Sequence, residues 1–292
     1  MTAAIFAARA NLKTVIVEER VCGGLANWTN TVENFPSHIS INGMELMERV
    51  LAQVQRLGVE VDQAAEVERL DLLGPVKTVE TSEYVYTGRA IILATGRQPI
   101  SLKVETECDR IHYCSVCDGS AYAGKKILVV GGGNSGFDES LYLLSLGVTE
   151  ITLVEALENC SASETTQAKL RRHGNVDIRT CTAVTAIAKE GKGCRVTLEK
   201  ARCAERESLY VDGIFVFIGQ TANTQMLRGL VELDPQGYII AGPNMETNVQ
   251  GVFAAGDVVQ KSYRYLTTAM ADGTIAALAA EKYLRAAREI AT

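Results

Sequence analysis

The chain has 292 residues, of which 47% are apolar and 22% charged, the composition of a globular protein long enough for two domains. Its net charge is −6 and no segment concentrates lysine and arginine, so we expect no nucleic-acid partner. Apolar runs such as Ala90–Ala94 are far shorter than the roughly 20 residues of a membrane helix, and the N-terminus lacks the basic start of a signal peptide, so we expect a cytoplasmic protein without a membrane segment.

The first predicted elements form the second half of a nucleotide-binding βαβ unit. Thr2–Ala10 predicts a helix, and Thr14–Val17 predicts a strand that Glu18 closes, where a carboxylate would bind a ribose. The first strand and glycine turn of such a unit do not precede this helix. Because that strand is central in a doubly wound sheet, we expect its neighbours to keep unpaired sides. Either the true start lies upstream, which we favour, or the protein tolerates a gap.

Two more elements are predicted before residue 100. Glu45–Leu57 carries leucine and valine at helical spacing and is expected to form an amphipathic helix. Ala90–Gly96 is an apolar strand that ends in a glycine turn. This pattern is typical of strands that lead to a nucleotide site.

The segment Lys125–Glu155 predicts a complete βαβ unit. The strand Ile127–Val130 leads into a glycine turn and a helix, and a second strand, Ile151–Val154, ends at the acid Glu155, which lies 19 positions after the last glycine. In this context G-x-G-x-x-G indicates dinucleotide binding, because its glycines allow the tight turn, the approach of a pyrophosphate and close packing of helix on strand. The three glycines are Gly131, Gly133 and Gly136.

The C-terminal part predicts a hairpin region and a second nucleotide-type exit. Residues Thr182–Ile218 alternate polar and apolar side chains, and Ile214–Gly219 is another strand that ends in glycine. Gly251–Asp257 precedes a small-residue helix over Thr267–Leu284. The predicted fold class is therefore α/β, with two Rossmann-like three-layer nucleotide-binding domains, one inserted in the other.

One pair of cysteines has a spacing that carries chemistry. Cys114 and Cys117 form a Cys-x-x-Cys motif at the start of a predicted helix, where thiolate is favoured and disulfide exchange is possible. Asp118 follows the pair and is a candidate to carry a proton to or from a departing sulfur. The alternative is half of a zinc site, but no second Cys/His pair has ligand spacing, and we expect no metal. The other six cysteines are expected to be single core or surface residues: Cys22, Cys108, Cys160, Cys181, Cys194 and Cys203.

Four motifs in order resemble those of the low-molecular-weight thioredoxin reductases, over Thr2 to about Leu284. TVENFPS stands where that family has a flavin-contacting VENFPG, and YCSVCDG resembles its redox disulfide motif. VVGGGNSG matches its second nucleotide loop, and GVFAAGDVVQKSYR is close to its C-terminal FAD signature. These motifs cover residues 31–37, 113–119, 129–136 and 251–264.

The resemblance implies an FAD-dependent disulfide oxidoreductase. The FAD domain would comprise residues 1–106, without its first strand and GxGxxG loop, together with residues 237–292, and the second dinucleotide domain would be residues 107–236. Cys117 would face the flavin and Cys114 would meet the disulfide of a partner such as a thioredoxin. Glu18 could also be a solvated strand-end acid, and Asp257 a helix N-cap. The implied cofactor-binding residues are Glu18, Gly23, Gly24, Asn34, Thr95, Gly96, Gly131, Gly133, Asn134, Ser135, Gly136, Glu155, Gly219, Gly256, Asp257 and Arg264.

One departure from the family concerns the electron donor. Where the reductases have a His-Arg-Arg cluster that grips the 2′-phosphate of NADPH, this chain has Glu155-Ala156-Leu157-Glu158. Carboxylates repel a phosphate and suit a free ribose diol, so NADH or a second adenine dinucleotide such as FAD is expected. The retained glycine loop together with the lost cations resembles the diflavin-linked disulfide oxidoreductases of cyanobacteria, with two FAD per chain.

Three functional hypotheses follow. The leading one is electron exchange between FAD and the Cys114–Cys117 disulfide, with a second FAD in the altered NADPH site. The second is a thioredoxin reductase that uses NAD(P)H or ferredoxin. The third, from another class, is a non-catalytic redox-sensing protein that uses the two cysteines as a switch. By analogy with the family we expect a homodimer.

Overall fold

The computed structural model describes residues 1–201 and 205–289 and divides the chain into two compact units. The first unit comprises Met1–Gln98 and Thr221–Thr292, and the second is Pro99–Gln220, inserted into the first as predicted. The chain passes between them through β7 (Arg97–Pro99) and β16 (Gln220–Ala222), which pair with each other. No helix in the described ranges is long and apolar enough to cross a membrane.

The unit boundaries differ from the predicted 106/107 and 236/237. Leu102 and Val104 pack against the core of the second unit, whereas Leu227 and Val231 belong to a core of the first unit. These segments lack regular secondary structure apart from a short 3₁₀ turn, so their patterns do not show which core they join. Side-chain burial decides the boundary.

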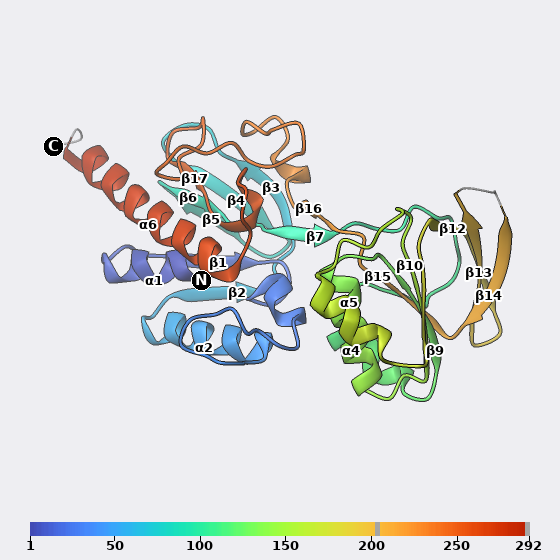
Figure 1. Cartoon of the computed structure of the whole chain (residues 1–292). Helices are drawn as coiled ribbons and strands as arrows, with labels where there is room; N and C mark the ends of the chain where they lie inside the picture. Colours follow the sequence, from blue (N-terminus) through green and yellow to red (C-terminus); the bar gives the residue numbers. More distant parts are fainter. Residues whose placement is uncertain (202–204, 290–292) are drawn as a thin grey trace. The chain divides into compact units, whose positions relative to one another are not determined.

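The second unit has three layers, which Figure 1 shows from the side. A five-stranded parallel sheet in the order β11-β10-β9-β15-β8 lies between two helices, α4 and α5, and a three-stranded antiparallel sheet in the order β12-β13-β14. The bounds of these elements are β8 Ile111–His112, α3 Ser115–Asp118, β9 Lys126–Val130, α4 Asn134–Ser145, β10 Glu150–Val154, α5 Glu164–Arg171, β11 Val176–Arg179, β12 Thr182–Glu190, β13 Gly193–Lys200, β14 Arg206–Val211 and β15 Gly213–Val216, with a 3₁₀ turn η2 at Gly119–Tyr122.

Alternation along β9 explains why both faces of this sheet are covered. Ile127 and Val129 pack toward the helices with Phe137, whereas Leu128 and Val130 pack toward the antiparallel sheet. Successive side chains of a strand point to opposite faces, so an uninterrupted apolar strand must be buried on both sides. The predicted βαβ unit is therefore present, and the predicted hairpin region supplies the third layer.

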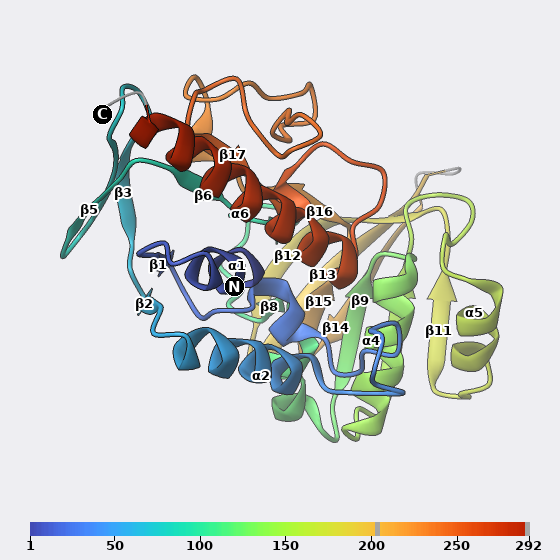
Figure 2. The ribbon, with the colours of Figure 1, turned by 90° about the vertical axis from the view of Figure 1, so that its left-hand side faces the viewer.

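The first unit is built around two pairs of parallel strands, β1-β2 and β17-β6. Helix α1 lies between α6 and α2 in both views (Figures 1 and 2), and the antiparallel strands β3, β4 and β5 form a separate sheet. The bounds are α1 Thr2–Arg9, β1 Val15–Glu18, α2 Gly43–Arg56, β2 Glu60–Gln63, β3 Val67–Asp71, β4 Lys77–Thr81, β5 Val85–Gly88, β6 Ile91–Leu93, β17 Val252–Ala254 and α6 Leu266–Glu289, with 3₁₀ turns η1 Gly24–Trp28, η3 Gln225–Leu227 and η4 Gly256–Val258.

The parallel strands of the first unit form two separate pairs. In the described ranges β1 pairs with β2 alone, and β17 pairs in register with β6, from Val252↔Ile91 to Ala254↔Leu93. The other edge of β17 forms an isolated antiparallel bridge, Phe253↔Glu246. Within the described ranges β1 and β6 thus each keep an unpaired side, as expected. Small residues of α6, Ala276 and Ala280, cover β17 at Phe253.

One prediction about the cysteines is wrong. Cys108 and Cys194 form a disulfide across 86 positions, and both lie in the core between the two sheets of the second unit. Sequence spacing cannot reveal this pair, because β13 and the segment before β8 meet only when the third layer folds onto the sheet. Cys22, Cys160 and Cys181 are free thiols, and Cys203 lies outside the described residues.

Candidate active site

The Cys-x-x-Cys motif forms a disulfide at the beginning of α3. The sulfurs of Cys114 and Cys117 are bonded at 2.04 Å, and Cys114 is the N-cap residue of the helix. The backbone N–H of Cys117 donates to Cys114 Sγ at 3.0 Å, an interaction that would favour a thiolate at Cys114 after reduction. Cys117 is exposed and Cys114 is buried, so the roles assigned to the two sulfurs by resemblance stay predictions.

Asp118 belongs to a small polar cluster that the sequence did not indicate. Its Oδ2 lies 3.2 Å from His112 Nδ1, and His112 Nε2 lies 2.6 Å from the hydroxyl oxygen of Tyr122. Burial lowers the pKa of His112, an effect that the neighbouring Asp118 carboxylate opposes, and burial raises the pKa of Tyr122. The signal was present in the sequence, since His112 and Tyr122 flank the motif, but a lone histidine carries little information by itself.

A second carboxyl group lies behind the disulfide. Glu139 of α4 accepts a hydrogen bond from the hydroxyl of Ser115, the buried residue between the two cysteines and directly after Cys114. Burial raises the pKa of Glu139, while the Ser115 hydroxyl acts in the opposite direction. Helix α4 begins at the glycine loop and carries Glu139, so it connects this loop to the redox motif.

The glycine loop of the second unit has the geometry of a dinucleotide-binding turn. Gly131 has φ +119°, and a Cβ there would lie 2.2 Å from the carbonyl oxygen of Phe217. A Cβ on Gly136 would lie 1.9 Å from the carbonyl oxygen of Gly131, so α4 can pack this closely only with glycine. Gly133 is the N-cap residue of α4, and Asn134 and Ser135 are exposed in its first turn.

Glu155 is brought to this loop by β10. Its Oε2 accepts from the Gly132 N–H at 2.6 Å, and its Oε1 accepts from the Leu157 N–H at 2.9 Å. Burial and Glu155 together raise the pKa of the Cys160 thiol, while Arg171 of α5 lowers it. On the neighbouring strand the Arg179 guanidinium forms ion pairs with Asp177 and Glu207 at 2.7 and 2.9 Å. The Glu155 carboxylate therefore lies at the glycine loop, and the positive charge of Arg179 is already paired with Asp177 and Glu207.

The first unit places Asp257 in a polar cluster at the end of β17. Lys261 Nζ lies 2.7 Å from Asp272 Oδ2 and 3.5 Å from Asp257 Oδ1. Within the described ranges the buried Asp257 Oδ1 accepts no hydrogen bond. A buried acceptor of this kind is normally satisfied, so it fits a hydroxyl donor of a bound molecule. Asp257 lies inside the η4 turn, whose N-cap residue is Ala255, and not at a helix N-cap.

The other residues predicted to hold FAD are distributed over the first unit, apart from Gly219 in the second. Glu18 ends β1 and accepts from the Arg20 N–H at 3.0 Å, and the Thr95 hydroxyl donates to the Asn223 carbonyl at 2.7 Å. Arg264 stacks on Tyr238 at 4.0 Å from the ring centroid. The remaining predicted residues lie in turns: Gly23 and Gly24 at η1, exposed Asn34, Gly96 after β6, Gly219 after β15, and Gly256 in η4.

The residues present fit the ribitol or ribose side of an FAD molecule. Asp257 offers the unsatisfied acceptor, and Glu18 offers a carboxylate at the end of a parallel strand, where nucleotides bind in such sheets.

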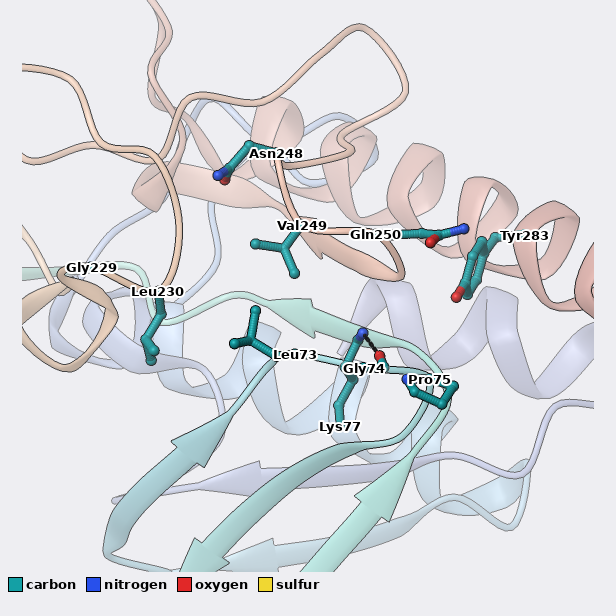
Figure 3. A pocket seen from close by; sticks show the side chains of 10 residues that line it. All are labelled: Leu73, Gly74, Pro75, Lys77, Gly229, Leu230, Asn248, Val249, Gln250 and Tyr283. Carbon is teal, nitrogen blue, oxygen red and sulfur yellow. Dashed lines mark hydrogen bonds between the residues drawn. The ribbon is translucent and has the colours of Figure 1, made fainter.

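A cavity of ≈770 Å³ in the first unit involves none of these residues. Figure 3 shows its lining, from the loop after β3 to Tyr283 of α6. The buried Lys77 donates from Nζ to the carbonyl oxygen of Gly74. None of the predicted cofactor residues lines this cavity.

Comparisons with known proteins agree on one family. The model of the pyridine nucleotide-disulphide oxidoreductases matches residues 1–273. A 34.2 kDa protein in the rubredoxin operon of Clostridium pasteurianum is 38% identical over 97% of this chain and 93% of its own length. The thioredoxin reductase of Bacillus subtilis (strain 168) is 34% identical over 99% of this chain and 92% of its own.

Solved structures give the same result. The thioredoxin reductase of Lactococcus lactis (FR conformation) is 31% identical, covers 97% of this chain and 94% of its own, and superposes with a TM-score of 0.89. The reductase of T. acidophilum is 28% identical over 96% and 93% of the two chains, with a TM-score of 0.88.

Proposed function

Since this chain belongs to the pyridine nucleotide-disulphide oxidoreductases and is an FAD-dependent, thioredoxin reductase-like disulfide oxidoreductase, we propose that its Cys114–Cys117 pair exchanges electrons with FAD and with the disulfide of a thioredoxin-like partner. Membership of this enzyme family sets aside the non-catalytic alternative. The observation that carries the proposal is the disulfide at the start of α3, with Asp118 beside it. When bound, FAD supplies the acceptor or donor of an electron pair.

The cysteines and Asp118 perform the exchange with the partner. In the reduced enzyme the Cys114 thiolate forms a bond to one partner sulfur, the partner disulfide breaks, and its other sulfur leaves with the electron pair and takes a proton from Asp118. The Cys117 thiolate then bonds to Cys114 Sγ and releases the first partner sulfur, which takes a second proton that Asp118 has drawn from water. Two electrons and two protons pass to the partner, and the enzyme disulfide is restored.

We propose that the second nucleotide site selects against a 2′-phosphate and holds a second FAD or NADH. The support is the Glu155 carboxylate, which two backbone N–H groups hold at the glycine loop. Exposed Glu158 adds a second negative charge in the same segment. A doubly charged phosphate there would meet like charge at short range, whereas a ribose diol would meet acceptors. A retained glycine loop together with acidic residues in place of the cations is the feature on which the resemblance to the diflavin-linked enzymes rests.

A second candidate concerns the donor. The relative from Clostridium pasteurianum is named for its place in a rubredoxin operon, and this favours an iron-containing electron carrier such as ferredoxin as the reductant in place of a pyridine nucleotide. The partner thioredoxin is proposed from the names of the thioredoxin reductases, one of which is fused to thioredoxin in Mycobacterium leprae. A homodimer is proposed from the family resemblance alone.

Flavin stoichiometry and anaerobic reduction test these proposals. Denaturing extraction should release two flavins per chain, and NADPH should bleach the flavin slowly or not at all. One flavin per chain with rapid bleaching by NADPH would refute the altered second site. One flavin with bleaching by reduced ferredoxin, but not by NADH or NADPH, would select the second candidate.

A further inference from the structure

A row of three side chains in the second unit ends at the Asp118 carboxylate. The hydroxyl oxygen of Tyr122 lies 2.6 Å from His112 Nε2. On the other side of the ring, His112 Nδ1 lies 3.2 Å from Asp118 Oδ2. We call Tyr122, His112 and Asp118 the His112 row.

The partners of the imidazole fix its tautomer. A carboxylate oxygen only accepts, so the ring hydrogen lies on Nδ1, and Nε2 is then an acceptor for the Tyr122 hydroxyl. Every donor of the row is therefore directed toward Asp118.

Packing holds the ring in place. The centroids of His112, Tyr122 and Phe215 lie 5.1–5.3 Å from one another, with the Tyr122 and Phe215 rings edge to face. Tyr122 is 1% exposed and Phe215 is fully buried. A Cβ at Gly213 would lie 2.2 Å from the Tyr122 ring, so this glycine leaves the space that Tyr122 occupies. Such contacts leave His112 little freedom to rotate.

Asp118, by contrast, needs a partner to be held. Its side chain is 40% exposed and that of His112 is 17% exposed. Without the Nδ1–H donor, an aspartate at the surface would sample several rotamers. A proton donor held in one place reacts faster than one that must first be found by rotation.

We propose that His112 is a positioning residue that holds Asp118 for proton transfer in thiol–disulfide exchange, and that Tyr122 holds His112 in the tautomer that donates from Nδ1. This inference rests on the proposed function of Cys114, Cys117 and Asp118. The step is the one described above: the proton moves from the Asp118 carboxyl to the departing partner sulfur, and His112 keeps its own proton throughout.

The charged and titratable groups around His112 define the pH dependence. They are Asp118, Tyr122, Arg110 and Asp109, and Lys125 lies 5.0 Å from the centroid of the Tyr122 ring. Protonation at Nε2 would add a hydrogen that faces Tyr122 and a positive charge near Arg110. It would also replace the neutral hydrogen bond to Asp118 by an ion pair. The rate of thiol–disulfide exchange should therefore change as the pH passes through the lowered pKa of His112.

The test is single-turnover oxidation of the reduced holoenzyme by bis(2-hydroxyethyl) disulfide from pH 5 to 9, followed by the return of the oxidised flavin absorbance, because an alkyl thiol leaving group takes up a proton at these pH values. His112→Phe should lower the rate about tenfold at pH 7, an effect on the scale of misplacing a catalytic group. His112→Asn places an amide N–H where Nδ1–H stood and does not titrate, so it should recover most of the lost rate.

The ratio of wild-type to His112→Asn rates should change below pH 6.5 and be constant above it. The exposed His173→Asn variant is the control and should match wild type. Equal rates for wild type and His112→Phe, or a ratio that does not change with pH, would overturn the proposal.

A double-mutant cycle separates this proposal from the proposed function. If His112 acts through Asp118, then His112→Phe should change the rate less than twofold in an Asp118→Asn background. A full tenfold further loss there would overturn the positioning role while leaving the Asp118 role intact. An Asp118→Asn variant as fast as wild type would instead refute the proton transfer itself.

Tyr122→Phe should lower the rate two- to fivefold, which provides a readout if His112→Phe fails to fold. No effect of Tyr122→Phe would contradict the role of Tyr122 in holding the tautomer of His112.

Discussion

The two nucleotide folds of this chain differ in how much of a βαβ unit each contains. The inserted unit has strand, glycine loop, helix, strand and acid, from β9 to Glu155, and these pack into one five-stranded sheet. In the outer unit the parallel strands form two separate pairs. The glycine loop of the inserted unit organises its site because it joins α4 to the central strand at one close contact. The outer unit instead offers groups on turns between its elements, such as Asp257.

The largest difference between the units should appear when a redox sulfur is removed. Cys117→Ser breaks the disulfide in the inserted unit and leaves the outer unit untouched, so exchange with a disulfide substrate should fall at least about 1000-fold while bound flavin is unchanged. Turnover with thioredoxin and the flavin absorbance measure the two effects. Cys181→Ser is the matched control, since its thiol is free. Persistent exchange in Cys117→Ser would remove this pair from the mechanism.

The second disulfide offers a test of stability that is confined to the inserted unit. Replacing Cys108 and Cys194 together by Ala should lower the free energy of unfolding of this unit by about 2–4 kcal/mol, because the bond closes a long loop and both residues are buried. Urea unfolding followed by a probe in each unit would show the change. An equal loss in the outer unit would mean that the two units do not unfold separately.

The preference for NADH over NADPH tests the role of Glu155 in the inserted unit. Glu155→Arg replaces the carboxylate at the glycine loop by a guanidinium, which should shift the ratio of NADPH to NADH affinity about 10- to 100-fold toward NADPH. Equilibrium titration of both nucleotides measures this ratio. Glu155→Gln is the control, because it keeps an acceptor for the Gly132 N–H, and it should shift the ratio less. An unchanged ratio in Glu155→Arg would place the 2′-phosphate elsewhere.

The corresponding change in the outer unit should affect the affinity for flavin alone. Asp257→Ala removes an acceptor that the protein itself leaves unsatisfied, and the affinity for FAD should fall about tenfold, or about 1.4 kcal/mol. Reconstitution of the apoprotein with FAD measures the loss. Asp257→Asn keeps an oxygen acceptor and should lose less. If both variants bind FAD like wild type, Asp257 does not contact the cofactor.

The smallest effect should be a pH dependence that arises at Glu139. Burial raises the pKa of this carboxyl in the folded protein above the unfolded value of 4.5, so the folded state binds the extra proton. Its contribution to stability is complete below pH 4.5 and is lost as the pH rises through the folded pKa. Glu139→Gln should therefore gain stability relative to wild type as the pH increases from 5 to 8. A difference that does not change with pH would mean that Glu139 is ionised in the folded protein throughout this range.

Much of this protein was determined by its local patterns. The uninterrupted apolar run at Ile127–Val130, the glycine spacing from Gly131 to Gly136 and the Cys-x-x-Cys motif each depend on residues close together in the chain. The structure contains the strand, the turn and the disulfide that they predict. Local patterns also fixed α1, α2 and α6 to within a few residues of their ends. Steric and hydrogen-bonding rules act over such short distances, so sequence alone suffices for them.

Only the tertiary structure decided which distant groups meet. The Cys108–Cys194 bond, the contact between Ser115 and Glu139, and the unit boundaries after residues 98 and 220 all join or separate segments that no spacing rule relates. His112 is the clearest example, because its position on β8 against Phe215 and Tyr122 comes from the parallel register Phe215↔His112. The physical reason is that burial and side-chain partnership depend on which elements pack together, and packing is a property of the whole fold.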